Sequence, residues 1–196
     1  MASDRTAIIC RSIKEDDLER MADFTVREEG GFLASYLAYK ANGKIYSPAL
    51  HDETSSRART YIVENTLTGE IIAYFTLKAG MVGIKQNRFP YNRSVDSVPG
   101  IEVANFAVNK TYKKKHENLR GIGYMIFNDF ILPKVEEARS IVGVRILYIY
   151  ALPREELIEH YHTYGFARLA SFQQKYIEKW FQPRYDQGCV FMYQIL

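Results

Sequence analysis

The sequence predicts a mixed α/β fold within one domain. Short runs rich in β-branched and aromatic residues recur along the chain, and stretches with apolar residues at helical spacing lie between them. No linker, low-complexity tract or internal repeat interrupts the order, which we interpret as strand, helices, hairpin, strand, helix, strand, helix, strand, strand. Such an order predicts one sheet with helices packed on it.

Composition and charge favour one globular protein and exclude several classes. The chain has 196 residues, of which 47% are apolar and 25% are charged, and these proportions are not those of a disordered protein. The formal net charge of +3 favours anionic ligands only weakly and is far below that of a dedicated nucleic-acid binder.

The sequence also predicts a cytoplasmic protein without a metal site. Its start is charged, and no apolar run approaches the roughly 20 residues that span a bilayer. Cys10 and Cys189 lie far apart and are expected in the core, as in a reducing compartment. The four histidines are scattered and form no metal-ligand pattern.

The first part of the chain predicts a strand and two helices. Residues 7–10 form a short apolar run, and residues 14–27 carry apolar side chains at helical spacing. A second helix is expected over residues 32–39, with Asn42 and Gly43 as its stop signal.

A β-hairpin is predicted next. Residues 60–63 and 71–77 are rich in β-branched and aromatic residues, and residues 65–70 between them favour a turn. Residues 79–100 mix Gly, Asn, Arg, Ser and Pro without periodicity, so we expect an irregular excursion, either one wall of a substrate cleft or a surface loop.

The second half alternates strands with helices. Residues 101–108 alternate as a strand, with the Glu102 side chain on the same face as apolar residues. After a basic loop, Gly121 opens a helix that Pro133 must bend or divide. The remaining expected elements are a strand over 144–150, a helix from Pro153 to Gly165, and strands over 166–169 and 188–196.

The start of the helix at Gly121 is a candidate phosphate site. Glycines allow a phosphate to approach the backbone, and a helix N-terminus offers N–H donors and a positive dipole end. Lys113, Lys114, Lys115 and Arg120 would add attraction for the phosphates of a ligand. A lysine run is more often a solvated charge cluster, and otherwise it contacts a phosphate group or RNA. Gly-Ile-Gly alone is weak evidence.

Three segments in order resemble the GNAT superfamily of acetyl-CoA-dependent N-acetyltransferases. Residues 106–109 (Phe-Ala-Val-Asn) are similar to the family's fourth strand, and residues 121–123 (Gly-Ile-Gly) to the end of its Gln/Arg-x-x-Gly-x-Gly/Ala pyrophosphate loop. Residues 159–166 are similar to its Phe-Tyr-x-x-x-Gly-Phe segment. Two departures are Asn118, where the family has Gln or Arg, and a stretch before Gly121 that is about five residues longer than usual.

The resemblance implies a single N-acetyltransferase domain over residues 1–196, with a largely antiparallel mixed sheet flanked by helices. The sheet would splay between the strands at 101–108 and 144–150, with acetyl-CoA in the gap. The implied acetyl-CoA-binding residues are Phe106, Ala107, Val108, Asn118, Leu119, Arg120, Gly121, Ile122, Gly123 and Tyr124. No metal is implied.

Acetyl transfer to an amine needs a base for the amine and an acid for the leaving thiolate. Tyr161 matches the superfamily tyrosine that acts as the acid, and otherwise it is a core aromatic residue. Glu102 lies where some members carry a base, and a partly apolar cleft would raise its pKa as that role favours. The alternative for Glu102 is an exposed strand residue or an ion-pair partner.

Looser similarity points to the branch that contains acetyltransferase toxins of toxin–antitoxin pairs, whose members acetylate aminoacyl-tRNA. It rests on residues 59–61, 73–77, 142–145 and 150–152. The acceptor therefore stays open between a small molecule, a peptide and aminoacyl-tRNA, and the superfamily makes a homodimer possible. A non-catalytic acyl-CoA-binding module is the alternative from another class, because a fold does not guarantee chemistry.

Overall fold

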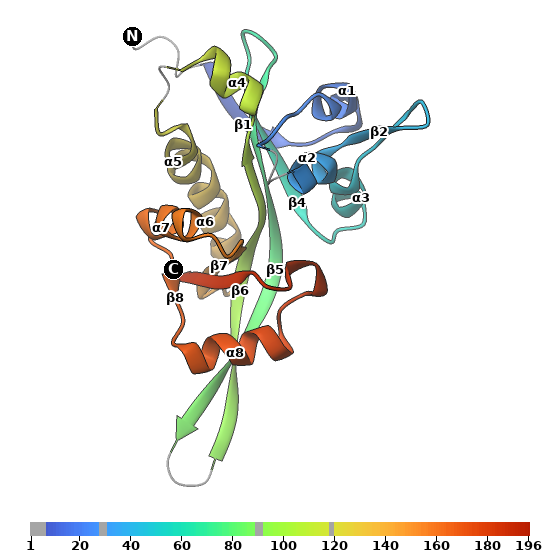
Figure 1. Cartoon of the computed structure of the whole chain (residues 1–196). Coiled ribbons are helices and arrows are strands. Elements are labelled where there is room, and N and C mark those ends of the chain that lie inside the picture. Colours follow the sequence, from blue (N-terminus) through green and yellow to red (C-terminus); the bar gives the residue numbers. More distant parts are fainter. Residues whose placement is uncertain (1–6, 28–30, 89–91, 118–119) are drawn as a thin grey trace. The chain divides into compact units, whose positions relative to one another are not determined.

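The structure is a computed structural model, in which residues 7–27, 31–88, 92–117 and 120–196 are described (Figure 1). The chain forms two compact units, and each combines two stretches of sequence. Unit 1 consists of residues 1–78 and 104–133, and unit 2 of residues 79–103 and 134–196.

Seven strands form the main sheet, in the order β1-β4-β5-β6-β7-β9-β8. Their bounds are β1 (Ile8–Ser12), β4 (Arg59–Asn65), β5 (Ile71–Arg88), β6 (Asn92–Val108), β7 (Ile146–Ala151), β8 (Ala167–Arg168) and β9 (Val190–Ile195). The pair β6–β7 is parallel, whereas the pairs β1–β4, β4–β5, β7–β9 and β8–β9 are antiparallel. The predicted mixed, largely antiparallel sheet is therefore confirmed.

Unit 1 contains the predicted first strand and hairpin. β1 pairs with β4, and β4 pairs with β5. The expected first helix is a short 3-10 turn, Glu15–Asp17, followed by α1 (Leu18–Ala22). These elements enclose a core that contains Met21, Phe24, Leu37, Ile62 and Tyr74.

An ion-pair cluster with buried carboxylates and partly exposed arginines joins the N-terminal helix region to β4. Arg11 and Arg20 both bind Asp17 and Glu64, and Arg20 also donates to the Gly69 carbonyl at 2.8 Å. Burial raises the pKa of Asp17, but hydrogen bonds from Arg11 and Arg20 outweigh burial and hold this pKa at about 2. The cluster is therefore ionised throughout the neutral range.

The prediction of a helix stop at Asn42 and Gly43 was wrong. Helix α2 ends earlier (Gly31–Leu37), and β2 (Tyr39–Ala41) and β3 (Lys44–Tyr46) form a separate hairpin. Asn42 and Gly43 have φ of 51° and 71°, as a two-residue hairpin turn requires. Helix α3 (Pro48–Thr54), which the pattern did not predict, follows with Ser47 as its N-cap.

The prediction of an irregular excursion over residues 79–100 was also wrong. β5 continues to Arg88 and β6 begins at Asn92, so this part of unit 2 consists of two long strands that are neighbours in the sheet. Its glycines make room for aromatic rings instead of breaking the strands. A Cβ on Gly80 would lie 1.9 Å from the Tyr148 hydroxyl oxygen, and one on Gly83 would lie 2.1 Å from the Phe181 ring.

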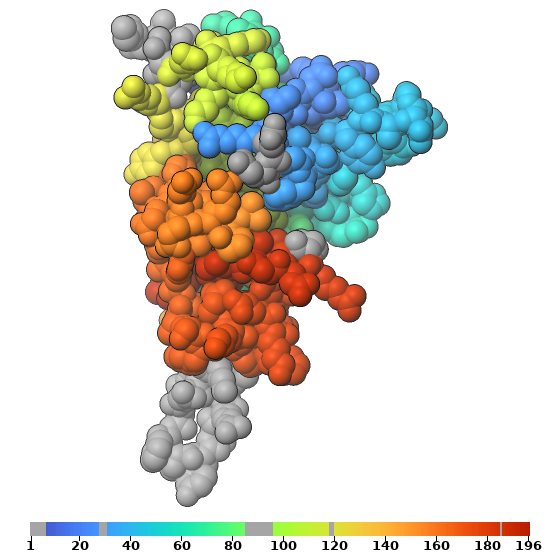
Figure 2. All heavy atoms as spheres, in the orientation of Figure 1, coloured from blue at the N-terminus to red at the C-terminus, as the bar shows by residue number. Residues whose placement is uncertain are grey.

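Unit 2 also contains β7, β9 and β8, with helices α7 (Glu155–Thr163) and α8 (Ser171–Trp180) at its surface (Figure 2). The prediction missed α8 altogether. Its Ile177 is fully buried against an apolar cluster that includes Val82, Tyr148 and Phe191. Helix α8 thus covers the sheet face formed by β5, β6, β7 and β9.

Of two predictions around Gly121, one needs correction. The basic loop after β6 is helix α4 (Lys110–Lys115), because the Asn109 side chain caps its first turn by accepting from Thr111 N at 3.0 Å. The predicted division of the next helix is present as a change of helix type just before Pro133. α5 (Ile122–Ile126) passes through a π-helical turn at Phe127–Ile131 into α6 (Leu132–Ile141), which accommodates the missing Pro133 N–H.

Within the described residues, no helix has both the length and the apolar character needed to cross a bilayer.

Candidate active site

At the end of β6, the main-chain N–H and C=O groups point alternately toward β5 and away from it. Asn109 N donates to Ile72 O of β5 at 2.8 Å, and the Asn109 side-chain amide donates to Ile71 O at 2.9 Å. Main-chain groups of successive strand residues alternate in direction. Ala107 therefore faces β5, whereas the N–H and C=O groups of Phe106 and Val108 point away from β5, toward the opposite edge of the strand.

The parallel ladder between β6 and β7 is short. It joins Gly100, Ile101 and Glu102 to Ile146, Leu147 and Tyr148, whereas β7 pairs with β9 over all six of its residues. The described register of β6 with β7 thus ends at Glu102, six residues before the end of β6.

The candidate phosphate loop begins α5 in unit 1. Gly121 is the N-cap and has a φ of 73°, and the first bond of the helix runs from Met125 N to Gly121 O. The N–H groups of Ile122 and Gly123 precede that bond, so the helix itself does not engage them. Arg120, Gly121 and Tyr124 are exposed. Asn118 and Leu119 lie outside the described residues.

The lysine run forms the last turn of α4. Lys115 pairs with Glu70 at 2.5 Å, and Lys113 and Lys114 are exposed. The ion pair to Glu70 ties the helix to the turn before β5, so Lys115 has a structural partner within unit 1.

Glu102 is buried in unit 2, with 7% of its surface exposed. It lies on β6 directly opposite Tyr148 of β7. The expectation of an exposed strand residue is therefore excluded, and Glu102 is a carboxyl group within the sheet.

Tyr161 is held rigidly at the end of α7. Its carbonyl accepts hydrogen bonds from Tyr164 N and Phe166 N at 3.0 and 3.1 Å, across the turn in which Gly165 has a φ of 89°. The Tyr161 ring packs edge-on against Phe166 at 5.9 Å. Burial raises the pKa of Tyr161 to about 12, so the phenol is protonated at neutral pH. Its hydroxyl has no hydrogen-bond partner among the described residues.

The expectation that both cysteines lie in the core is met by one of them. Within the described residues, no group of three or more His, Cys, Asp or Glu side chains is placed to hold a metal ion. His162 bonds to the Phe166 carbonyl at 2.8 Å, which helps to hold the turn after Tyr161. Cys189 is buried as expected, whereas Cys10 is only half-buried.

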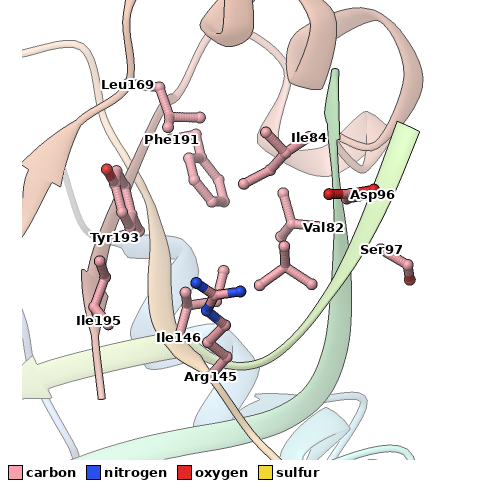
Figure 3. A pocket seen from close by; sticks show the side chains of 11 residues that line it. Val82, Ile84, Asp96, Ser97, Arg145, Ile146, Leu169, Phe191, Tyr193 and Ile195 are labelled. Atoms are coloured by element: carbon pink, nitrogen blue, oxygen red, sulfur yellow. The ribbon is translucent and has the colours of Figure 1, made fainter. Parts of the chain in front are cut away.

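Unit 2 contains a pocket that no sequence motif indicated. Its volume is about 410 Å³, and apolar side chains from β5, β6, β7 and β9 line it together with Arg145 and Asp96 (Figure 3). These residues lie far apart in the sequence, and only the pairing of the strands brings them together.

The sequence finds no match among protein-family models or among curated proteins. Solved structures do match in fold. A tyrosine-to-phenylalanine mutant of KacT matches with a TM-score of 0.65 at 16% identity, covering 96% of this chain and 95% of that chain.

Two further matches contain acetyl-CoA. One is a tyrosine-to-phenylalanine mutant of the AtaT toxin bound to the C-terminus of the antitoxin AtaR and acetyl-CoA, with a TM-score of 0.63, 16% identity, and 96% and 93% coverage. The other is AtaTR bound with acetyl-CoA, with a TM-score of 0.61, 14% identity, and 97% and 94% coverage. The chain thus shares its fold with these solved structures, one of which is named a toxin, and this agrees with the resemblance to the toxin-containing branch.

Proposed function

We propose that this chain is an N-acetyltransferase, a single domain over residues 1–196 that transfers the acetyl group of acetyl-CoA directly to a primary amine. The observation that carries the proposal is the coincidence of two independent findings. The fold is shared with toxins solved with acetyl-CoA bound, and the three GNAT-like sequence segments fall on β6, the start of α5 and the end of α7 of that fold.

The residues of unit 1 fit the chemistry of CoA. The outward main-chain groups of Phe106 and Val108 are suited to hydrogen bonds with the amides of the pantetheine arm. The first-turn N–H groups of Ile122 and Gly123, next to the exposed Arg120, are suited to a pyrophosphate. A Cβ at Gly121 would meet no atom of the described residues within 4 Å, so these residues leave space for a ligand in front of this turn. Asn118 and Leu119 are proposed to complete the loop.

When bound, acetyl-CoA supplies the acetyl group and a thiolate leaving group. The amine must be neutral to attack, because an ammonium ion has no lone pair. We assign Glu102 as the base that accepts the amine proton, directly or through a water molecule, because it is a buried carboxyl group on β6. The amine nitrogen then bonds to the acetyl carbon as the carbon–sulfur bond breaks.

We assign Tyr161 to the leaving thiolate. Its pKa of about 12 exceeds the roughly 8.5 of an ordinary thiol, so complete proton transfer from the phenol is unfavourable at equilibrium. Its hydroxyl therefore acts as a hydrogen-bond donor to the negative charge that develops on sulfur. CoA leaves as the thiolate and takes its proton from solvent, and Glu102 returns the amine proton to solvent.

The test is CoA release from acetyl-CoA with a panel of polyamines, amino acids, peptides and charged tRNA. Acceptor-dependent release by the wild-type chain, lost in Glu102→Gln, supports the proposed transferase. Tight binding of acetyl-CoA without release for any acceptor would instead support a non-catalytic acyl-CoA-binding module. Failure to bind acetyl-CoA would overturn the proposal.

A toxin that acetylates aminoacyl-tRNA is a second candidate, favoured because the matched structures include proteins named as toxins. Expression of the wild-type chain would then arrest growth, and Tyr161→Phe would relieve the arrest at equal protein level. Acetylation of charged tRNA but not of free amino acids would identify this acceptor. Growth at the normal rate with full activity on small amines would exclude it.

A further inference from the structure

The pocket of unit 2 combines an apolar floor with a positively charged group. The floor is formed by Val82, Val98, Ile146 and Phe191, each at most 8% exposed, and α8 packs against the same cluster through Ile177. A volume of about 410 Å³ lies within the range of small-molecule sites. The pocket is therefore preformed and large enough for a ligand.

Arg145 carries the positive charge of the pocket. Figure 3 shows its guanidinium directed among the apolar side chains. Its main chain is fixed on both sides, because Arg145 N donates to Pro99 O and Arg145 O accepts from Leu196 N, each at 3.0 Å. The guanidinium itself has no hydrogen bond or ion pair with any described residue, so its five donors are available to a ligand.

We propose that this pocket binds a ligand in which a carboxylate is attached to an aliphatic or aromatic group. The planar guanidinium matches a carboxylate with two parallel hydrogen bonds, and the apolar part of the ligand covers Phe191, Ile84 and Leu169. Asp96 on the opposite wall disfavours ligands with several negative charges, such as phosphates. None of the pocket's lining residues is among those assigned to acetyl transfer, and the proposal does not depend on that activity.

The first test is titration calorimetry of the full chain without acetyl-CoA. The probes are 3-phenylpropanoate and 4-methylpentanoate, their neutral amides, acetate and inorganic phosphate. The two apolar acids are expected to bind at least tenfold more tightly than their amides, acetate or phosphate. Equal binding of acid and amide would overturn the proposal, because the carboxylate would then make no contribution.

Variants locate the site. Arg145→Gln is expected to weaken binding of 3-phenylpropanoate at least tenfold, and Arg145→Lys less, since lysine keeps the charge but loses the paired hydrogen bonds. The control is Arg184→Gln, an exposed arginine of the same unit outside the pocket, which should bind as the wild type does. Unchanged binding by Arg145→Gln would overturn the proposal.

Methyl NMR provides a readout that is independent of any loss of stability. The acid should shift the methyl signals of Ile84, Leu169 and Ile195, and leave that of Ile9 on β1 unchanged. A tripeptide ending in leucine, compared with its amide, then separates two sources of the carboxylate. Tighter binding than the small acids identifies a peptide terminus, and weaker binding identifies a small acid. If the acid shifted methyl signals only at residues outside the pocket, this result would contradict the assignment of the pocket as the binding site.

Discussion

The guanidinium of Arg11 contacts both carboxylate oxygens of Asp17, at 2.7 and 2.8 Å. The pKa of Asp17 is lowered from 3.8 to about 2 in the folded chain. Because the folded pKa lies below the unfolded value, Asp17 stabilises the fold above about pH 4, and this contribution disappears as the pH falls toward 2. We expect the free energy of unfolding to drop by on the order of 2 kcal/mol over that interval, measured by urea unfolding at several pH values.

Asp17→Asn tests the same cluster at neutral pH. The variant leaves two arginines near a single carboxylate, so a loss of roughly 3 kcal/mol is expected, with a flatter pH dependence below pH 4. Asp16→Asn is the matched control, because Asp16 is exposed and its substitution should change stability by less than about 0.5 kcal/mol. Equal losses of stability for the two substitutions would contradict the proposed contribution of the ion-pair cluster to the free energy of unfolding.

Gly121→Ala is expected to weaken acetyl-CoA binding. Gly121 has a φ of 73°, which alanine adopts at a cost of about 1 kcal/mol, and the methyl group would narrow the space before the first turn of α5. Gly43→Ala is the control, since Gly43 has a φ of 71° in the β2–β3 turn of the same unit. Both variants should lose similar stability, but only Gly121→Ala should raise the Kd for acetyl-CoA. If both variants had a similar Kd for acetyl-CoA, Gly121 would not be part of the acetyl-CoA site.

Tyr161→Phe is expected to reduce CoA release at least tenfold, about 1.4 kcal/mol of transition-state stabilisation. The hydroxyl has no described partner, so the free energy of unfolding should change by less than about 0.5 kcal/mol. Tyr164→Phe, in the same turn, should keep its rate per folded molecule. The rate of the wild type should show no titration of Tyr161 below about pH 11, since its pKa is about 12. Equal rates for wild type and Tyr161→Phe would refute the assigned role.

Gly80→Ala is expected to destabilise the chain by about 1–3 kcal/mol, because its Cβ would lie 1.9 Å from the hydroxyl oxygen of Tyr148 and would push the ring aside. Gly143→Ala is the control in the same unit, since a Cβ there meets nothing within 4 Å. Thermal or urea unfolding compares the two. If Gly80→Ala lost as little stability as Gly143→Ala, the Tyr148 ring would move aside without a cost in free energy.

The sequence predicted the elements whose signals are local. The hairpin of β4 and β5, the strand ending at Val108 and the helix stopped by Gly165 all follow from periodicity and turn residues within a few positions. The resemblance to a family, rather than periodicity, assigned Gly121 to acetyl-CoA binding and Tyr161 to acid catalysis. Both roles remain predictions.

Three of the misses share a physical cause, because each depends on partners distant in sequence. Gly80 and Gly83 look like strand breakers until the rings of Tyr148 and Phe181 occupy the space above them. Helix α8 is defined by Ile177 packing on strands that lie far away along the chain. The pocket around Arg145 needs the pairing of β7 with both β6 and β9, which no motif encodes.

The position of β9 has a consequence for synthesis on the ribosome. β9 lies between β7 and β8 in the sheet, although it follows both in the sequence. While residues 190–195 are still inside the exit tunnel, β7 lacks one neighbour and β8 lacks its described partner. The nascent chain thus cannot complete the Arg145 pocket, whose wall includes Phe191, Tyr193 and Ile195, until this late strand emerges and inserts.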